Sequence, residues 1–228
     1  MIKNIYHKII NYSLEEKKLL SYIKKYANHN DVLDVGCGYG RILRILKSEK
    51  YNALGVDINP EIVDACKREN LSCITVDDFL KKKSSEKWDV IVMFHVIEHL
   101  EPTECLEFMD SYLDFLKPGG ILIIATPLLT SYFYEDFDHI KPYSPIGIKM
   151  VFGENAAQVQ FSSRNKVEMI DLWYKKYFFR LTNYRFLFFP RSKIIMPILN
   201  VFFALIFKMS FGLLGKKDGW LGVFRKLP

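Results

Sequence analysis

The chain has 228 residues, which is enough for one α/β domain with a full core but too few for two large domains. Its hydrophobic fraction of 50% and mean hydropathy of +0.02 are high for a fully water-exposed globule and too low for a polytopic membrane protein. The formal charge of +6 is unevenly distributed, because residues 1–163 carry 19 Lys/Arg and 23 Asp/Glu whereas residues 164–228 carry 13 and 3.

The N-terminal segment predicts a helix and no export signal. Residues 1–12 mix lysine, asparagine and histidine with apolar residues and lack the uninterrupted apolar core of a signal peptide. We therefore expect the protein to stay in the cytoplasm. Ser13, followed by Glu16 three residues later, predicts a capping box at the start of a helix.

Residues 32–126 alternate short apolar runs with stretches of helical periodicity. The apolar runs, which we predict to be strands, are 32–35, 53–56, 73–76, 88–94 and 121–126. The helical stretches are 42–47, 60–69 and 103–116. This alternation is typical of βαβ units, and the short runs without polar alternation indicate strands buried on both faces. We therefore expect an α/β fold with a Rossmann-like, doubly wound and mostly parallel sheet.

The pattern changes after Pro127. We expect three further elements, a helix over 144–152, a strand over 167–173 and an antiparallel last strand near 220–225. The chain is predicted to form one Rossmann-like domain from residues 1–174 and 218–228, with residues 175–217 as a basic, apolar helical insertion.

The four cysteines form no CxxC pair. They are Cys37, Cys66, Cys73 and Cys105. In a reducing compartment such isolated cysteines are usually small core residues, so we assign them neither disulfides nor a metal.

A glycine-rich loop follows the first predicted strand. Gly36, Gly38 and Gly40 come directly before a helical stretch, and glycine lets a ligand approach the backbone without a Cβ in the way. Asp57 lies 21 residues after Gly36, at the end of the next strand, where a carboxylate can accept hydrogen bonds from two ribose hydroxyls. The pattern predicts a site for a ribose-containing cofactor.

The chief alternative cofactor is a nicotinamide dinucleotide, whose fingerprint is G-x-G-x-x-G and whose glycine loop receives a pyrophosphate. The spacing here is G-x-G-x-G, and Asp34 precedes the first glycine by two residues. An anion at that position opposes a pyrophosphate but suits the ammonium group of an amino acid. The cofactor is therefore predicted to be cationic and free of phosphate.

Together, the motifs within residues 30–127 resemble the class I S-adenosylmethionine methyltransferases, especially the ubiquinone-biosynthesis O-methyltransferases and those of cell-surface polysaccharide clusters. Five elements in order carry the resemblance: Val32–Gly40, Gly55–Pro60, the pair Asp77-Asp78 before Phe79, Trp88–Leu100 and Leu116–Ile124. The resemblance implies a methyltransferase with S-adenosylmethionine as its cofactor.

The resemblance also implies roles for single residues. The methionine part of the cofactor would be held by Asp34, Gly36, Cys37, Gly38 and Gly40, and the ribose by Asp57. Ile58 and Phe79 would pack against the adenine, and Phe94 would border the cofactor through its backbone. Asp77 or Asp78 would accept a hydrogen bond from the adenine amino group, while an N-cap or a solvated turn is the alternative for the other.

Two histidines are candidate bases. Methyl transfer mainly requires alignment and exclusion of water, but a hydroxyl acceptor must also lose its proton, a task suited to histidine. His99 and His139 follow predicted strands, at the carboxyl ends where open α/β sheets place ligands. We predict a base among these two and a substrate contact at Tyr143, with packing as the alternative role of His99.

His95, Glu98 and His99 also match the H-x-x-E-H pattern of metalloproteases. That pattern needs its histidines on a helix and a third ligand beyond them, whereas here it begins at a strand end. A divalent metal that assists the acceptor hydroxyl is a closer alternative, because related quinone methyltransferases use a carboxylate and a histidine here. We predict catalysis without a metal.

Residues 194–214 form an apolar stretch that Pro197, Asn200 and Lys208 interrupt, so we do not expect a full membrane span. Cations flank it at Arg191, Lys193, Lys216 and Lys217. Residues 164–228 also contain 15 of the 34 aromatic residues, and cations mixed with aromatic rings favour an anionic membrane surface. The alternative is a helix that caps the core or forms a dimer interface.

We therefore predict an S-adenosylmethionine-dependent methyltransferase that methylates an oxygen of a membrane-associated acceptor, such as a lipid-linked saccharide or a quinone precursor. The alternatives are a soluble small-molecule or RNA methyltransferase and a degenerate scaffold subunit. Cations interleaved with long apolar runs count against nucleic acid as the partner. The intact Asp34, glycines and Asp57 count against a scaffold.

Overall fold

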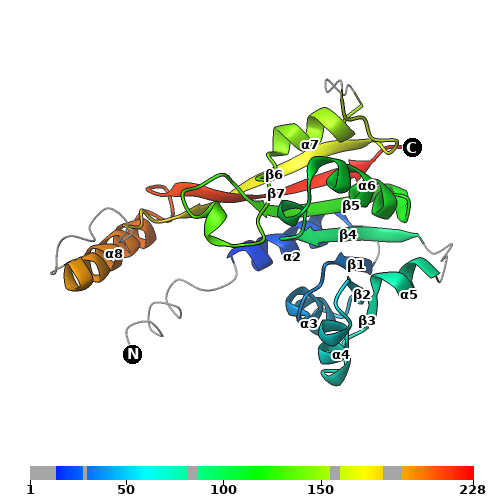
Figure 1. Ribbon diagram of the computed structural model, residues 1–228, viewed down its shortest axis with the longest axis horizontal. Helices are drawn as coiled ribbons and strands as arrows, with labels where there is room; N and C mark the ends of the chain where they lie inside the picture. Colours follow the sequence, from blue (N-terminus) through cyan, green and yellow to red (C-terminus); the bar gives the residue numbers. More distant parts are fainter. Residues whose placement is uncertain (1–13, 28–29, 82–86, 155–159, 182–191) are drawn as a thin grey trace.

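The computed structural model describes residues 14–27, 30–81, 87–154, 160–181 and 192–228. A seven-stranded sheet runs through the molecule in the strand order β3-β2-β1-β4-β5-β7-β6 (Figure 1). The strands are β1 (Asp31–Val35), β2 (Asn52–Asp57), β3 (Cys73–Thr75), β4 (Trp88–Phe94), β5 (Leu116–Pro127), β6 (Val167–Tyr177) and β7 (Lys216–Lys226). Strands β1 to β5 pair in parallel, whereas β7 is antiparallel to both β5 and β6. The expected Rossmann-like sheet with an antiparallel last strand is confirmed.

Helices cover both faces of the sheet. They are α2 (Leu14–Tyr26), α3 (Arg41–Ser48), α4 (Pro60–Arg68), α5 (Val76–Lys81), α6 (Pro102–Leu113), α7 (Pro145–Phe152) and α8 (Ser192–Met209), with the 3-10 turns η1 (Ile97–His99) and η2 (Phe133–Glu135). Helices α2 and α3 contribute to the core on one face, and α5, α6 and α7 to the core on the other. Helix α8 lies apart, at the far end of the long strands β6 and β7 (Figure 1).

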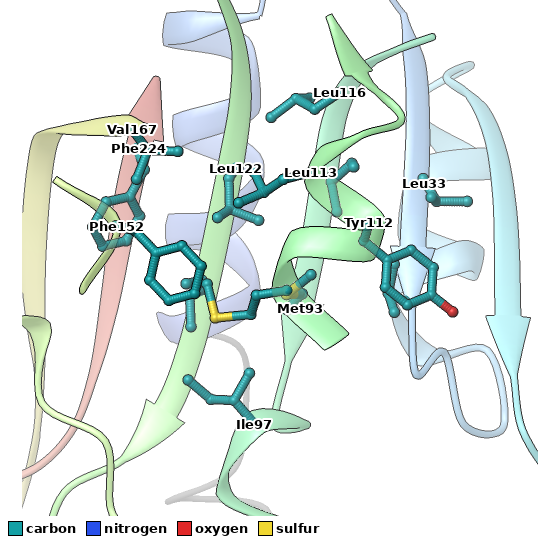
Figure 2. Close-up of a cluster of buried hydrophobic side chains, with 14 of the residues drawn as sticks. Leu33, Met93, Ile97, Tyr112, Leu113, Leu116, Leu122, Phe152, Val167 and Phe224 are labelled. Carbon is teal, nitrogen blue, oxygen red and sulfur yellow. The ribbon is translucent and has the colours of Figure 1, made fainter. Parts of the chain in front are cut away.

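The central strands supply apolar side chains to both cores. In β4, Met93 belongs to the core under α6 and α7, whereas its neighbour Val92 belongs to the core under α2 and α3. Figure 2 shows the first of these cores, where Met93, Leu113, Leu122 and Phe152 lie together. Because helices cover both faces, the strands need no polar alternation, which explains the continuous apolar runs in the sequence.

Some boundaries differ from those expected. The helix expected over 103–116 ends at Leu113, and Leu116 already pairs with Trp88 as the start of β5. The Pro-Gly-Gly sequence that follows Lys117 cannot continue a helix, which is why the chain turns into a strand there. Strands β6 and β7 pair as far as Tyr177 and Lys216, so they include both ends of the 175–217 segment. Ser13 of the expected capping box lies outside the described residues.

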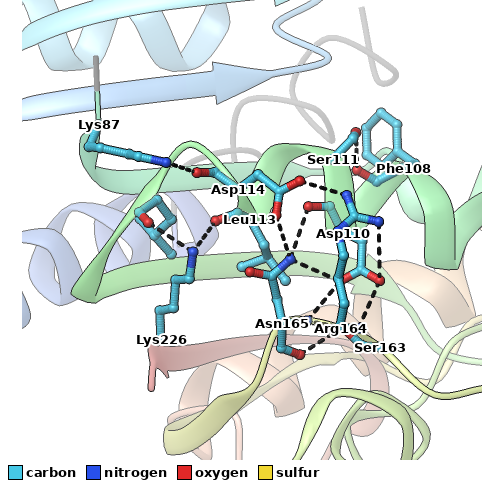
Figure 3. A network of polar contacts seen from close by, with 11 residues as sticks. Lys87, Phe108, Asp110, Ser111, Leu113, Asp114, Ser163, Arg164, Asn165 and Lys226 are labelled. Atoms are coloured by element: carbon cyan, nitrogen blue, oxygen red, sulfur yellow. Dashed lines mark hydrogen bonds and ion pairs between the residues drawn. The ribbon is translucent and has the colours of Figure 1, made fainter. Parts of the chain in front are cut away.

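A polar network joins α6 to the segment before β6, at the amino ends of the parallel strands (Figure 3). The Asp110 carboxylate accepts a hydrogen bond from the Ser163 hydroxyl at 2.5 Å and one from the Asn165 backbone at 3.2 Å. Asp114 pairs with Arg164 at 2.6 Å. These charges are neutralised within the network, which indicates a structural role for this edge of the sheet.

Helix α8 is attached through the polar side chain of Asn200 and the buried side chain of Met196. The Asn200 side chain accepts a hydrogen bond from the Leu181 N–H at 2.7 Å and donates one to the Leu181 carbonyl at 3.0 Å. On the outer side of the helix, Phe202 and Leu205 are 54% and 51% exposed. These two side chains therefore lie outside the core. Of the helices in the described part of the chain, none is long and apolar enough to cross a bilayer.

Candidate active site

The glycine loop folds back over the end of β1. Gly36 has φ +70°, and a Cβ there would lie 2.5 Å from a methyl carbon of Val96, so only glycine fits. Gly38 has φ +50°, and a Cβ there would meet no atom within 4 Å. The backbone of Gly38 therefore borders open space that a ligand can occupy.

Asp34 lies beneath this loop and is 1% exposed. Within the described chain, its Oδ2 atom has no hydrogen-bond partner. Burial raises the pKa of Asp34 to about 8, with the charge of Cys73 acting in the same direction and that of Arg41 opposing it. An unpartnered buried carboxylate oxygen is costly, and the ammonium group of an amino-acid ligand would satisfy it. This oxygen fits the methionine part of S-adenosylmethionine.

Asp57 ends β2 and connects two segments of the site. Its Oδ2 atom accepts a hydrogen bond from the Gly38 N–H at 2.9 Å, and its Oδ1 atom accepts one from the Asn59 N–H at 3.0 Å. Each carboxylate oxygen has a second lone pair, which leaves an acceptor for each of two ribose hydroxyls. Ile58 beside it is 85% exposed and offers an apolar surface.

The residues expected around the adenine divide into exposed and buried groups. Asp77 and Asp78 lie exposed in the first turn of α5, where the Thr75 hydroxyl accepts a hydrogen bond from the Asp78 N–H at 3.2 Å. Phe79 is buried among the side chains of α6, with its ring stacked on that of Tyr112 at 5.8 Å. The helical turn directs this ring into the core, and its packing against the adenine stays a prediction.

Phe94 closes the other side of the loop. It is buried at the end of β4, and the Arg41 guanidinium lies 5.3 Å from the centre of its ring. Arg41 also pairs with Glu16 of α2 at 2.9 Å. The N-terminal helix is thereby attached to the cofactor loop, a contact for which the sequence pattern contains no signal.

Three of the cysteines that the sequence analysis treated as isolated come together under the glycine loop. The Cys37 and Cys73 sulfurs are 3.2 Å apart, and Cys66 donates a hydrogen bond to the Gly38 carbonyl at 3.3 Å. They are free thiols whose sulfurs all lie within 4.8 Å of one another, close enough to hold a soft metal ion. The Cys37 side chain packs away from the ligand space, so only its backbone can border the cofactor.

The two candidate bases lie side by side. His99 is in η1 after β4, His139 is in the loop after β5, and their ring centroids are 5.0 Å apart. His99 Nδ1 lies 3.1 Å from the Asp138 carbonyl oxygen, and His139 Nδ1 lies 2.7 Å from that of Phe133. A carbonyl can only accept, so each neutral imidazole carries its proton on Nδ1 and a lone pair on Nε2. His99 Nδ1 also lies 3.3 Å from the Asp138 carboxylate, and His139 Nε2 lies 3.8 Å from that of Asp136, so of the two rings it is His99 whose Nε2 atom has no polar partner among the described residues.

A buried network fixes the turn that carries His99. Glu98 is fully buried, accepts a hydrogen bond from the Thr126 hydroxyl at 2.9 Å and bonds His95 Nδ1 at 3.1 Å. His95 Nε2 reaches Glu15 of α2 at 3.3 Å, and Lys175 pairs with Glu15 at 2.9 Å. Burial by itself would lower the pKa of His95, but its hydrogen bonds with the two glutamates raise that pKa to about 9. The imidazolium of His95 thus joins α2 to the turn.

This geometry does not match a metalloprotease. His95 ends a strand with φ +59° and His99 lies in a 3-10 turn, so the two histidines do not share a helix. Glu98, His99 and His139 do place ligand atoms within 4.8 Å of one another, so they could hold a divalent cation. Both Glu98 oxygens already take part in hydrogen bonds, which favours the network described above.

Tyr143, the expected substrate residue, lines a cavity that none of the candidate cofactor residues lines. This cavity of about 190 Å³ lies between α6 and α7. The Tyr143 hydroxyl donates a hydrogen bond to the Leu100 carbonyl at 2.9 Å, and its own carbonyl accepts one from the Trp220 indole at 2.8 Å. These bonds fix the position of Tyr143 beside the turn that carries His99, and its contact with the substrate stays a prediction.

Comparison with known sequences identifies relatives of this chain. Residues 6–170 match a family described as a methyltransferase domain. The ubiquinone biosynthesis O-methyltransferase of Actinobacillus pleuropneumoniae is 30% identical over 121 residues, which cover 47% of this chain and 51% of that protein. The ubiquinone biosynthesis O-methyltransferase of Rickettsia canadensis is 34% identical over 118 residues, which cover 46% and 48%. The chain spans about half the length of the curated relatives it matches.

Solved structures show the same fold. A SAM-dependent methyltransferase from Archaeoglobus fulgidus has a TM-score of 0.60, covers 98% of this chain and 99% of its own, and is 23% identical. At this identity the likeness shows the fold, while the match over residues 6–170 identifies the family as that of the methyltransferase domain.

Proposed function

Because this chain belongs to the methyltransferase-domain family and is a class I S-adenosylmethionine-dependent methyltransferase, we propose that it methylates a hydroxyl oxygen of a membrane-associated acceptor. The acceptor class is a lipid-linked saccharide or a quinone precursor. The proposal has a chemical part, which concerns His99 and His139, and a surface part, which concerns α8.

The observation that carries the proposal is the arrangement of His99. Its Nδ1 atom lies 3.1 Å from the Asp138 carbonyl, and none of the described residues forms a hydrogen bond with its Nε2 atom. A hydroxyl becomes a sufficiently strong nucleophile when a base takes its proton, and a neutral imidazole with a lone pair on Nε2 can do this. His139, in contact with the His99 ring at 5.0 Å, is the second candidate.

The cofactor residues meet the histidines at one edge of the sheet. The loops after β1, β2, β4 and β5 all leave the carboxyl ends of parallel strands, where ligands bind in open α/β sheets. S-adenosylmethionine, when bound, supplies a methyl group activated by its sulfonium. Asp34 would hold the amino group of that cofactor, Asp57 would hold the ribose, and His99 would orient the acceptor and accept its proton.

The outer side of α8 supports a membrane-associated acceptor. Ile198, Phe202, Leu205 and Met209 are 62%, 54%, 51% and 79% exposed on one helix. A continuous row of large apolar side chains costs free energy in water and is favourable at the boundary between headgroups and acyl chains. The inner side, which carries Asn200, faces the rest of the protein. The outer side of the helix is therefore apolar and exposed, while the inner side combines Asn200 with the buried Met196.

Charge around this helix supports the same partner. Residues 172–217 contain nine Lys/Arg and no Asp/Glu. Each cation near an anionic bilayer contributes about 1 kcal/mol at low salt, so the segment favours an anionic membrane surface. Arg185, Arg191 and the side chain of Lys193, which belong to this group in the sequence, lie outside the described residues.

The sequence relatives support oxygen as the methylated atom. Both are named ubiquinone biosynthesis O-methyltransferases. The family match over residues 6–170 includes the glycine loop and the His99 turn. The match covers about half of each relative, so we do not assign the acceptor of those proteins to this chain.

Transfer of a labelled methyl group tests the proposal. The protein is incubated with methyl-labelled S-adenosylmethionine and separated lipid, polysaccharide, RNA and small-molecule fractions of a cell extract. We expect label in the lipid-extractable fraction, attached to oxygen, and labelling that is about 100-fold slower with a His99→Ala variant that still binds the cofactor. Label in RNA, in a soluble small molecule or on nitrogen would contradict the proposal.

A further inference from the structure

A second cavity, of about 320 Å³, lies on the side of the molecule that carries α8. Three segments form its wall, namely residues 130–132 after β5, residues 177–180 after β6 and residues 216–218 at the start of β7. None of the cofactor residues and neither histidine lines it. The cavity therefore is a separate feature that the methyl-transfer site does not use.

Positive side chains outnumber negative ones in this cavity. The lining cations are Arg180, Lys216 and Lys217, and the lining carboxylate is that of Asp218. Among the described residues, none of the three cations forms an ion pair. The cavity thus retains an excess of positive charge, which an anionic ligand would neutralise.

Aromatic rings position two of these cations. The Arg180 guanidinium lies 5.8 Å from the centre of the Tyr132 ring, and the Lys217 ammonium lies 3.7 Å from that of Tyr174. The Tyr132 hydroxyl also donates a hydrogen bond to the Arg180 carbonyl at 2.9 Å. An aromatic face orders a cation without neutralising it, so the Arg180 guanidinium stays available to a ligand beside the lining residue Tyr132. The Lys217 ammonium lies over Tyr174, which does not line the cavity, so Lys217 must turn from that ring to reach a ligand.

The segment after β5 adds hydroxyl groups to the cavity wall. Thr130 and Ser131 lie in the loop after β5 and line the cavity beside the cations. A guanidinium, ammonium groups and hydroxyls within one cavity form the donor set that binds phosphate oxygens, because each donor forms a charge-assisted hydrogen bond with an anionic oxygen. A carboxylate could use fewer of these donors than a phosphate or diphosphate.

The chain connects this cavity to both parts of the proposed acceptor site. Phe133, the residue after the lining residue Tyr132, accepts a hydrogen bond from His139 at 2.7 Å. Leu181, the residue after the lining residue Arg180, is bonded to Asn200 of α8. The apolar helix α8, the cationic cavity and the two histidines are therefore connected in this order. This order matches an acceptor with an apolar tail, an anionic link and a hydroxyl-bearing head.

We propose that this cavity binds the phosphate or diphosphate group that links the lipid tail of the acceptor to its hydroxyl-bearing head. Binding there would hold the head near His99 while the tail stays on the outer side of α8. The role of the phosphate in the acceptor rests on the proposed function, and it favours a lipid-linked saccharide over a quinone precursor, which carries no such group.

Calorimetric titration of inorganic diphosphate tests the cavity without any methyl transfer. The test variant carries Arg180→Gln, Lys216→Gln and Lys217→Gln, and the matched control carries Lys17→Gln, Lys67→Gln and Arg68→Gln, which remove the same charge from exposed positions on α2 and α4. We expect the wild type to bind diphosphate and the test variant to bind it at least about 30-fold more weakly, because several charge-assisted bonds are lost. The control should stay within about twofold of the wild type, and S-adenosylmethionine affinity should be unchanged in all three.

Vesicles distinguish the two sources of phosphate. Sedimentation with phosphatidylglycerol vesicles measures attraction to bilayer headgroups, whereas inorganic diphosphate measures the cavity alone. If the wild type binds no diphosphate while the test variant loses vesicle binding, the cations serve the bilayer surface and the cavity proposal is overturned. Equal diphosphate binding by wild type, test variant and control overturns it as well. If diphosphate binding depends on the three cations but the labelled methyl group goes to a soluble acceptor, the cavity proposal stands and the proposed function fails.

Discussion

The region around β1 and β2 and the region around β6 and β7 present their binding groups to a ligand in opposite ways. Around β1 and β2 the groups are buried before any ligand binds, with Asp34 1% exposed and Asp57 held by backbone N–H groups of the loop it serves. Around β6 and β7 they are exposed, with Phe202 of α8 54% exposed and the Arg180 cation without a carboxylate partner in the described part of the chain. Preformed burial suits one invariant cofactor, whereas exposed groups gain their stabilisation from an external partner.

This difference leads to a ranking of expected effects. Substitutions on the cofactor side should remove defined hydrogen bonds and leave association with membranes intact. Substitutions on the acceptor side should leave cofactor affinity intact and change association or turnover.

The largest effect is expected from Asp57→Ala. Each charge-assisted hydrogen bond to a ribose hydroxyl contributes about 1.5–3 kcal/mol, so loss of two should weaken S-adenosylmethionine binding by about 100-fold or more. Calorimetric titration measures this directly. Asp57→Asn, which keeps the shape and one acceptor oxygen, should lose less, and both variants must unfold at a temperature near that of the wild type. Unchanged affinity in a folded Asp57→Ala protein would show that the ribose lies elsewhere.

A slightly smaller effect is expected from a triple variant of α8. Ile198→Ser, Phe202→Ser and Leu205→Ser remove half-exposed apolar side chains, each contributing about 1 kcal/mol to burial in a membrane interface. Partition onto anionic vesicles should fall by about 100-fold, as measured by sedimentation. Leu80→Ser with Ile146→Ser removes exposed apolar groups from α5 and α7 and is expected to have no effect.

Salt separates the two contributions to this association. Raising the salt concentration should weaken vesicle binding by the wild type, because ions screen the attraction between its cations and the bilayer, whereas the contribution of apolar burial persists. A wild type that does not sediment with anionic vesicles even at low salt contradicts the membrane proposal and leaves α8 as a contact for another protein or a second copy.

Loss of the catalytic base should lower the turnover rate and leave cofactor binding unchanged. In His99→Ala we expect turnover of a hydroxyl acceptor to fall by about 100-fold, because general-base catalysis contributes about that much, while S-adenosylmethionine still binds as in the wild type. His139→Ala is the matched comparison, since the two rings are in contact. Turnover within a few-fold of wild type in His99→Ala, together with a large loss in His139→Ala, would transfer the role of base to His139.

The smallest effect concerns pH and Asp34. Because burial raises the pKa of this carboxyl to about 8, the empty site is mostly protonated at pH 7. The ammonium of the cofactor requires the carboxylate, so binding at pH 7 should release most of one proton. The carboxylate fraction rises about fivefold between pH 7 and 8, but the free amino group begins to lose its proton over the same range, so affinity should rise by about two- to threefold.

Above pH 8 the sign should reverse. A free α-amino group has a pKa of about 7.7–8.0, so it must take up a proton to bind as an ammonium. Calorimetry in buffers of different ionisation enthalpy measures the number of protons exchanged. Asp34→Asn should abolish the release at pH 7 and keep the uptake above pH 8. Proton release at pH 7 in Asp34→Asn would assign the linkage to another group.

The sequence by itself determined the cofactor side. Strand, glycine loop, helix and Asp57 are adjacent or nearly adjacent in the chain, so local geometry places them together once a strand turns into a helix. The same reasoning placed His99 and His139 at carboxyl ends of strands, and the change of pattern after Pro127 led to a last strand near residues 220–225. Turns in which the backbone sets the position can be predicted from residue types.

Only the tertiary structure decided which distant groups meet. Glu15 reaches His95, and the sulfurs of Cys37 and Cys73 touch, because helices and strands remote in sequence pack side by side. Phe79 turned into the core because a short helix directs one side inward, a rotation that residue type does not specify. The cationic cavity likewise combines the ends of β5, β6 and β7. Contacts between segments depend on sheet order and helix rotation, and both are set by burial of the whole core rather than by any local pattern.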